Sequence, residues 1–109
     1  MVSRALAPLA MLTCLASADL RAEPDAARQA ELLHRLRHDC GSCHGMTMKG
    51  GLGPPLLPEV LAGRDDAELA RVIVDGRPGT PMPPWDFEIS DAEAEWLVRA
   101  LKKGLDDAG

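Results

Sequence analysis

Two cysteines and a histidine stand almost side by side in this chain, as Cys40-Gly41-Ser42-Cys43-His44. Residues three apart lie on one side of a helical turn, so both thiols can reach the edge of one flat group, with the following imidazole beneath it. The pattern C-x-x-C-H is typical of covalent haem attachment through two thioethers. We therefore expect Cys40 and Cys43 to anchor one haem c and His44 to bind its iron.

Two other chemistries use a C-x-x-C pair, thiol redox exchange and zinc binding. A thioredoxin-like site would need a βαβ pattern, which the sequence lacks, and a zinc site would need a further ligand such as His34, His38 or an acid. We expect His34 and His38 on the surface or at the haem edge, and not on iron. A mature mass without a haem addition would favour these alternatives.

The amino-terminal residues predict an exported chain. Arg4 precedes the apolar run Ala5 to Ala16, and Ala16-Ser17-Ala18 suits a signal peptidase. We therefore expect residues 1–18 to be a signal peptide that is cleaved after Ala18. The run is shorter than the about 20 residues that a membrane-spanning helix needs, so no span is expected in the mature chain.

Cleavage of the signal peptide determines which residues and which cysteines remain in the expected mature domain. Cys14 is lost with the signal, residues 19–24 form a tether, and residues 25–109 form one domain in the periplasm. Exported thiols normally pair as disulfides, so a C-x-x-C-H pair in such a domain favours haem.

Composition limits what this domain can be. The chain has 109 residues, of which only 3% are aromatic, so its core is thin and a bound group is expected to complete it. Its net charge of -5 has the wrong sign for binding phosphate backbones. Nucleic acid is therefore excluded as an expected partner.

Apolar periodicity and capping residues predict helices and no strand. One helix begins near Asp25, with Pro24 available for its first turn, and places Cys40 on its apolar face. A second covers residues 66–75 between the cap Asp65 and Gly76, with Leu69, Val72 and Ile73 facing inward. The capping box of Ser90 and Glu93 begins a last helix that reaches about Lys103. Trp96 and Phe87 are expected in the core.

The second iron ligand decides what such a haem can do. Met46 and Met48 follow His44 too closely to reach the opposite face, because an extended residue spans only about 3.5 Å. Met82 lies far along the chain between Pro81 and Pro83-Pro84, where fixed backbone angles lower the entropy cost of presenting a weak thioether ligand. We expect Met82 to close the iron, which favours electron transfer, whereas an open face would admit peroxide, oxygen or nitric oxide.

Three further residues are candidates for contacts with the haem. The rigid Gly53-Pro54 segment can offer the Pro54 carbonyl to the far ring nitrogen of His44. Arg77 could hold a propionate or remain a solvated surface arginine. Trp85 could donate to a propionate or pack against the ring, and packing is the expected role.

Four segments, CGSCH, GLGPPL, GRPGTPMPPW and EWLVRAL, resemble those of a small class I cytochrome c, across nearly the whole mature chain. The chain is most similar to the periplasmic cytochrome c55X type, which accompanies dissimilatory cytochrome cd nitrite reductase in denitrifying bacteria. The resemblance implies an all-α fold of three to four helices around one haem, with the first and last helices crossing and His44 and Met82 on iron.

The expected function is one-electron transfer without an enzymatic reaction, by a monomer with redox protein partners. The resemblance implies service to nitrite reductase or a redox step in maturation of its d-type haem. Two rival functions are a haem enzyme or gas sensor with a weak or open distal ligand, and a factor that oxidises or hands over a tetrapyrrole.

Overall fold

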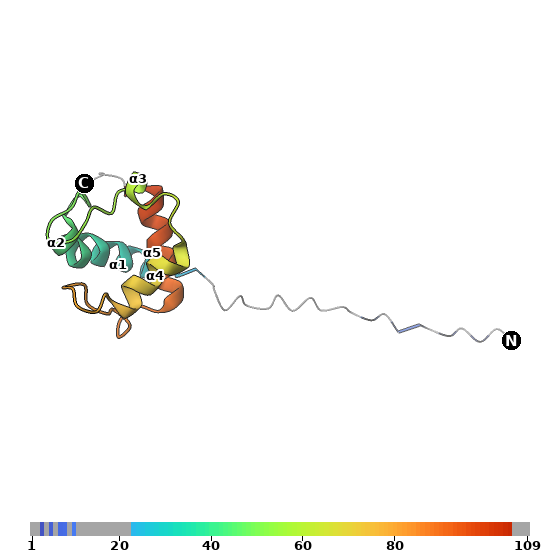
Figure 1. The fold of residues 1–109 in the computed structure, drawn as a ribbon. Helices are drawn as coiled ribbons and strands as arrows, with labels where there is room; N and C mark the ends of the chain where they lie inside the picture. Colours follow the sequence, from blue (N-terminus) through green and yellow to red (C-terminus); the bar gives the residue numbers. More distant parts are fainter. Residues whose placement is uncertain (1–2, 4, 6, 9, 11–22, 106–109) are drawn as a thin grey trace.

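All regular structure in the described part of the chain is helical, which confirms the all-α prediction (Figure 1). A computed structural model describes residues 23–105, with residues 3, 5, 7, 8 and 10 near the amino terminus. The expected cleavage site after Ala18, Cys14 and most of the tether lie outside the described residues. In chain order the helices are α1 (Ala26–Arg35), the π-helical η1 (Leu36–Cys40), α2 (Gly41–His44), α3 (Pro58–Leu61), α4 (Asp66–Asp75) and α5 (Asp91–Lys103).

The first three elements follow one another without a break. The Asp25 side chain caps α1 by accepting a hydrogen bond of 2.8 Å from the backbone N–H of Arg28, so Pro24 lies before the helix and not in its first turn. The wider turn of η1 ends at Cys40, and α2 ends where Gly45 takes a φ of 92°. The cysteines and His44 therefore lie on a continuation of the first helix.

The capping residues predicted for the other long helices are confirmed. Asp65 accepts from the backbone N–H of Glu68 at the start of α4, and Gly76 ends that helix with a φ of 69°. At the start of α5, Ser90 and Glu93 form both hydrogen bonds of the capping box. Residues 45–57 form a loop without regular structure, and the single turn of α3 that follows it was not predicted.

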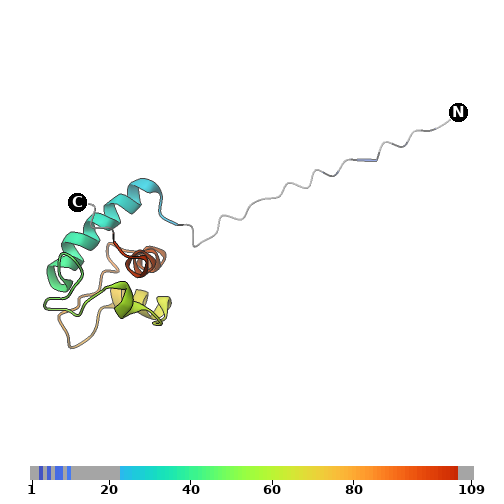
Figure 2. The same cartoon turned by 90° about the horizontal axis from the view of Figure 1, so that it is seen from above.

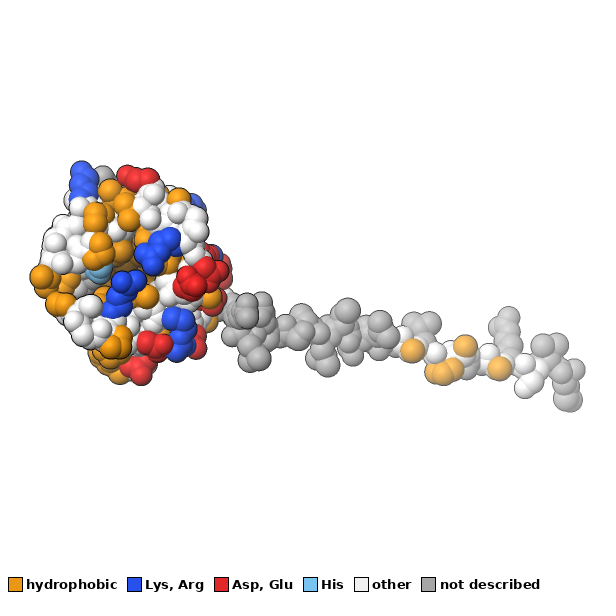
Figure 3. All heavy atoms as spheres, in the orientation of Figure 1, with side chains coloured by type: hydrophobic (Ala, Val, Ile, Leu, Met, Phe, Trp, Pro, Cys, Tyr) orange, Lys and Arg blue, Asp and Glu red, His pale blue; other side chains and the backbone are white. Residues whose placement is uncertain are grey.

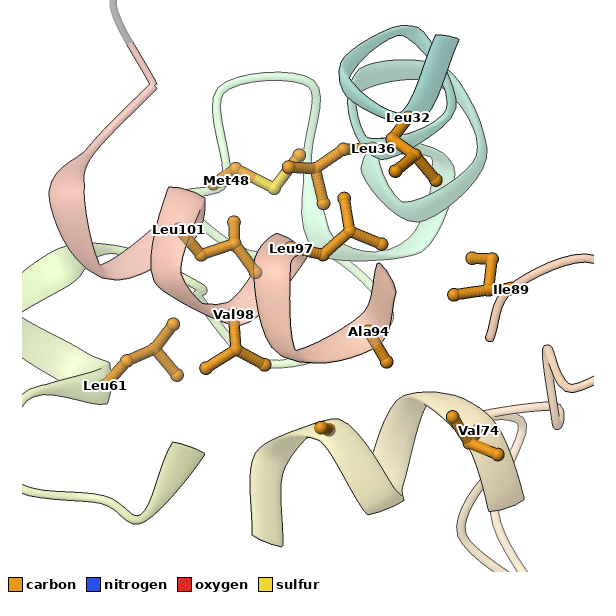
Figure 4. Packing of buried hydrophobic residues seen from close by; sticks show 11 residues of the cluster. Leu32, Leu36, Met48, Leu61, Val74, Ile89, Ala94, Leu97, Val98 and Leu101 are labelled. Carbon is orange, nitrogen blue, oxygen red and sulfur yellow. The ribbon is translucent and has the colours of Figure 1, made fainter. Parts of the chain in front are cut away.

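The core is built around α5, which packs against α1, α3 and α4. Figure 2 shows α1 running across α5, as the resemblance implied. Figure 4 shows Leu97 on the side of Leu32 and Leu36, and Val98 on the side of Leu61. The buried hydrophobic residues are Leu32, Leu36, Met48, Leu61, Ala70, Val74, Ile89, Ala94, Leu97, Val98 and Leu101.

Of the two aromatic residues expected in the core, only Trp96 packs against it. Phe87 is 71% exposed, so its assignment to the core was wrong. It lies in the turn that follows the proline-rich loop of residues 77–85. Its ring stacks on that of Trp85, with the ring centroids 5.8 Å apart. Trp96 is half-buried and packs against the core.

A polar connection joins α1 to α5 at their amino-terminal ends. Arg28 forms an ion pair with Glu93 and donates a 2.8 Å hydrogen bond to the backbone carbonyl of Glu88. The hydrogen bond from Arg28 lowers the pKa of Glu93 to about 2. One carboxylate thus both caps α5 and holds the first helix against it.

Candidate functional site

The predicted site residues surround a single cavity of about 570 Å³ between η1, α2, α3, α4 and the proline-rich loop. On the face shown in Figure 3, hydrophobic side chains gather around a histidine, with Lys and Arg side chains beside them. The cavity brings together all seven residues singled out from the sequence, which are Cys40, Cys43, His44, Pro54, Arg77, Met82 and Trp85.

The two cysteines enter the cavity from consecutive turns of the first helical stretch. Neither forms a disulfide, although they are only three residues apart. Burial raises the pKa of the Cys40 thiol to about 11, so it lies against apolar surroundings. The Ser42 hydroxyl between them donates a 2.7 Å hydrogen bond to the Asp39 carbonyl and so continues the helical turn. Both thiols remain available for a covalent bond to a group in the cavity.

The His44 imidazole is held in one orientation by the loop that follows it. Its Nδ1 lies 2.7 Å from the carbonyl oxygen of Pro54. A carbonyl can only accept, so Nδ1 donates and Nε2 keeps its lone pair for a metal. A Cβ added at Gly53 would lie 2.7 Å from Cε1 of His44, so only glycine allows the backbone this close to the ring.

The loop that presents Met82 is fixed at both ends. The backbone N–H of Arg77 donates to the Met82 carbonyl at 3.1 Å, and that of Trp85 donates to the Ile73 carbonyl at 3.0 Å. A Cβ on Gly76 would lie only 2.7 Å from the Met82 carbonyl oxygen, so α4 ends in direct contact with the loop. These contacts place Met82 on the cavity wall, half-buried.

The other two methionines of this region have different surroundings. Met48 is 3% exposed and belongs to the core, with a φ of 61°, and Met46 is 57% exposed. Neither lines the cavity. Of the three methionines considered as ligands, the structure brings only Met82 into the same cavity as His44.

Two arginines line the cavity, and the sequence pointed to only one of them. Arg64 and Arg77 make no ion pair with another described residue, whereas Arg28, Arg35, Arg71 and Arg99 each pair with a carboxylate. Arg64 lies between α3 and α4, outside any motif, so no sequence signal marked it. Two uncompensated guanidinium groups at an apolar cavity suit a ligand that carries carboxylates.

One wall of the cavity is formed by the stripe of α4 that was expected to face inward. Leu69, Val72 and Ile73 of α4 are only half-buried and face the cavity, while Ala70 and Val74 on the other side of the same helix are buried against the core. A flat apolar group in the cavity would complete their burial. Apolar walls, two thiols, one oriented imidazole, one thioether and two cations together fit a covalently bound haem with its propionates.

Comparisons with known proteins agree with this fit. The family model described as cytochrome C oxidase, cbb3-type, subunit III matches residues 25–99. The chain is 50% identical over 93 residues to cytochrome c55X of Paracoccus denitrificans (strain Pd 1222), covering 85% of this chain and 90% of that protein.

Two solved structures resemble the fold. The c-type cytochrome NirC superposes with a TM-score of 0.72 at 52% identity, covering 73% of this chain and 94% of that one. Dihydro-heme d1 dehydrogenase NirN, in complex with DHE, superposes with a TM-score of 0.61 at 36% identity over 71% of this chain, which corresponds to 16% of that larger protein. None of the helices in residues 23–105 has the length and apolar character needed to cross a bilayer.

Proposed function

The chain belongs to the cytochrome c family, among proteins of the cytochrome c55X type, and we propose that it carries single electrons through one haem c with His44 and Met82 as iron ligands. The observation that supports this most directly is the shared cavity. Cys40, Cys43, His44 and Met82 all line one otherwise apolar space. Thioether bonds from both cysteines would fix the haem beside His44, with Met82 supplied by the opposite loop.

A haem bound in this way supplies the Fe(III)/Fe(II) couple. The chain's own residues set the conditions for it. The Pro54 carbonyl accepts from Nδ1 of His44 and so raises the basicity of the other ring nitrogen. A thioether ligand and apolar walls both favour the reduced form, which carries less positive charge, so we expect a raised reduction potential.

Arg64 and Arg77 are the groups that we assign to the propionates. Both line the cavity and neither is compensated by a described carboxylate. A guanidinium can form two parallel hydrogen bonds to a carboxylate, which fixes its position as well as its charge. Trp85 also lines the cavity, and we assign it to packing against the ring.

The similarity to cytochrome c55X of Paracoccus denitrificans and to NirC supports a role for this activity in denitrification. We propose that the mature chain, formed by cleavage after Ala18, works in the periplasm as a monomer and exchanges electrons with nitrite reductase. Docking would be transient and would bury less than about 1,200 Å² near the haem edge.

A second candidate role is a redox step in maturation of a d-type haem. It is favoured by NirN, a dihydro-heme d1 dehydrogenase in which a domain of this fold makes up 16% of the chain. In that role this protein would receive electrons from a separate oxidising enzyme. Deletion of this chain alone distinguishes the two roles, because loss of d-type haem supports maturation and a normal level supports electron supply to nitrite reductase.

The ligand assignment is tested on protein exported together with haem-attachment machinery. The oxidised protein should show the weak red charge-transfer band of a sulfur-iron bond, and the reduced spectrum should not change with carbon monoxide. Met82→Ala should remove the band and allow carbon monoxide to bind. Met46→Ala is the matched control, because Met46 is exposed and outside the cavity, and it should behave as the wild type.

Carbon monoxide binding to the wild-type protein would contradict the electron-carrier proposal. It would instead favour a haem enzyme or gas sensor with an open distal face.

A further inference from the structure

His34 and His38 form a pair of exposed imidazoles on the helical stretch that leads to Cys40. Their ring centroids are 4.2 Å apart and the ring planes are tilted by 42°. His34 lies in the last turn of α1, and His38 lies in the π-helical turn of η1. Neither ring lines the haem cavity. The two side chains therefore already lie together, on a surface that the proposed function does not use.

The ring nitrogens have no other partner among the described residues. No side-chain hydrogen bond or ion pair joins the imidazole of His34 or His38 to another residue between 23 and 105. The nearby Arg35 forms ion pairs with Glu88 and Glu31. Because these carboxylates compensate its charge, Arg35 repels a bound cation less than an unpaired arginine would. The two imidazoles are thus accessible donors, and no side-chain hydrogen bond or ion pair to another described residue has to be broken for them to bind a metal ion.

The spacing and the donor type both suit a transition-metal ion. Histidines at i and i+4 of an α-helix present two imidazoles to zinc on one face. His38 lies in the π-helical turn of η1, and its ring still lies beside that of His34, with centroids 4.2 Å apart. Imidazole is a preferred ligand of divalent zinc, copper and nickel. Because no group of three or more His, Cys, Asp or Glu side chains is assembled as a metal site in the described chain, water would complete the coordination.

We propose that His34 and His38 together bind one divalent first-row transition-metal ion, such as Zn²⁺, at a surface site separate from the haem. Two protein ligands with water in the remaining positions make an exchangeable site and not a closed structural one. The site goes beyond electron transfer and does not depend on which redox partner the protein serves.

The haem-loaded protein gives a clean test of this site. The chain has three histidines, and His44 is assigned to the haem iron, so His34 and His38 are its two remaining imidazoles. In the haem-loaded mature protein, Cys40 and Cys43 are both held as thioethers. Zinc added to such protein therefore has few competing ligands of the imidazole or thiolate type.

Zinc chloride would be titrated into the reduced, haem-loaded protein by calorimetry. We expect one Zn²⁺ per chain, with binding weakened at least about tenfold by either His34→Gln or His38→Gln, since even an outer-shell change at a metal site commonly has an effect of that size. Glu59→Gln, which removes an exposed carboxylate on α3, is the matched control and should bind as the wild type. The ring-proton resonances of His34 and His38 should move together on addition of zinc.

Three results would overturn the proposal. They are no zinc binding by the wild type, unchanged binding in both histidine variants, and a loss of binding in Glu59→Gln equal to that in the histidine variants. An unchanged visible spectrum shows that each variant is folded around its haem. That readout is also separate from zinc binding, so failure of the metal site can be told apart from failure of the haem assignment.

Discussion

The carbonyl oxygen of Pro54 lies 2.7 Å from Nδ1 of His44, ten residues earlier in the chain. The contact depends on a close approach by the preceding residue, because the backbone of Gly53 passes directly against the imidazole. The orientation of His44 is therefore set by the loop of residues 45–57 as well as by the helix that bears it.

Gly53→Ala should disturb this orientation. The added Cβ would lie 2.7 Å from Cε1 of His44, so either the ring or the loop has to shift. We expect a lower thermal midpoint and a changed reduction potential, measured by calorimetry and by spectroelectrochemistry. Gly79→Ala is the control, because its Cβ would meet nothing within 4 Å. Its positive φ of 78° should cost about 1–2 kcal/mol in stability and leave the potential unchanged.

Loss of either cavity arginine should lower the reduction potential. A cation near the haem stabilises the added electron, so Arg64→Gln and Arg77→Gln should each lower the potential by a few tens of millivolts in low salt. Arg99→Gln removes a charge that pairs with Glu23 and does not line the cavity, and it should have a smaller effect. Equal shifts in all three variants would contradict the assignment of Arg64 and Arg77 to the propionates.

The protein should lose stability in acid through Glu93. The pKa of Glu93 is lowered from 4.5 to about 2 by its hydrogen bond with Arg28. A depressed carboxyl pKa contributes stability that is present above the unfolded value of 4.5 and is lost as pH falls towards 2. Glu93→Gln should therefore lower the unfolding free energy by about 1–2 kcal/mol at pH 7, and the difference from wild type should shrink towards pH 2.

An exposed surface ion pair is the comparison for Glu93. Arg71 pairs with Asp75 along α4, and both side chains are more than half exposed. Asp75→Asn should change stability by no more than about 0.5 kcal/mol. Denaturant unfolding at several pH values measures both variants, and a pH-independent effect of Glu93→Gln would contradict the linkage.

The exposed position of Phe87 predicts a small effect of its removal. Phe87→Ala should change the unfolding free energy by at most about 1 kcal/mol, the contribution of its contact with Trp85. Leu97→Ala, in contrast, removes a side chain that is 1% exposed at the centre of the core and should cost about 2–5 kcal/mol. Similar losses in the two variants would mean that Phe87 packs against the domain.

Local chemistry explains which parts of the fold were predictable. The bounds of α4 and α5 follow from Asp65, Gly76 and the capping box of Ser90 and Glu93, because a cap is decided within a few residues. The single turn α3 and the surface position of Phe87 depend on how distant segments pack. Hydrophobic character alone could not indicate that Phe87 would lie outside the core.

In the site, too, the residues marked by local motifs were predictable and those that depend on distant packing were not. The motif around Cys40 and the proline-flanked Met82 could be recognised from sequence, and the structure brings them to one cavity. Arg64 was missed because its role depends on a neighbourhood formed by α3, α4 and α5 and not on a motif. The stripe of Leu69, Val72 and Ile73 was correctly identified as inward. All three line the cavity, and Leu69 and Ile73 also pack against the core.

The central position of α5 has a consequence for the order of events as the chain emerges and folds. This helix contacts α1, α3 and α4, and it follows every other described helix in the chain. The core therefore cannot close until residues 91–103 have emerged, whereas Cys40, Cys43 and His44 emerge well before them. The emerging chain thus has an interval in which the thiols of Cys40 and Cys43 are accessible to a modifying enzyme, and that interval ends when the last helix packs into place.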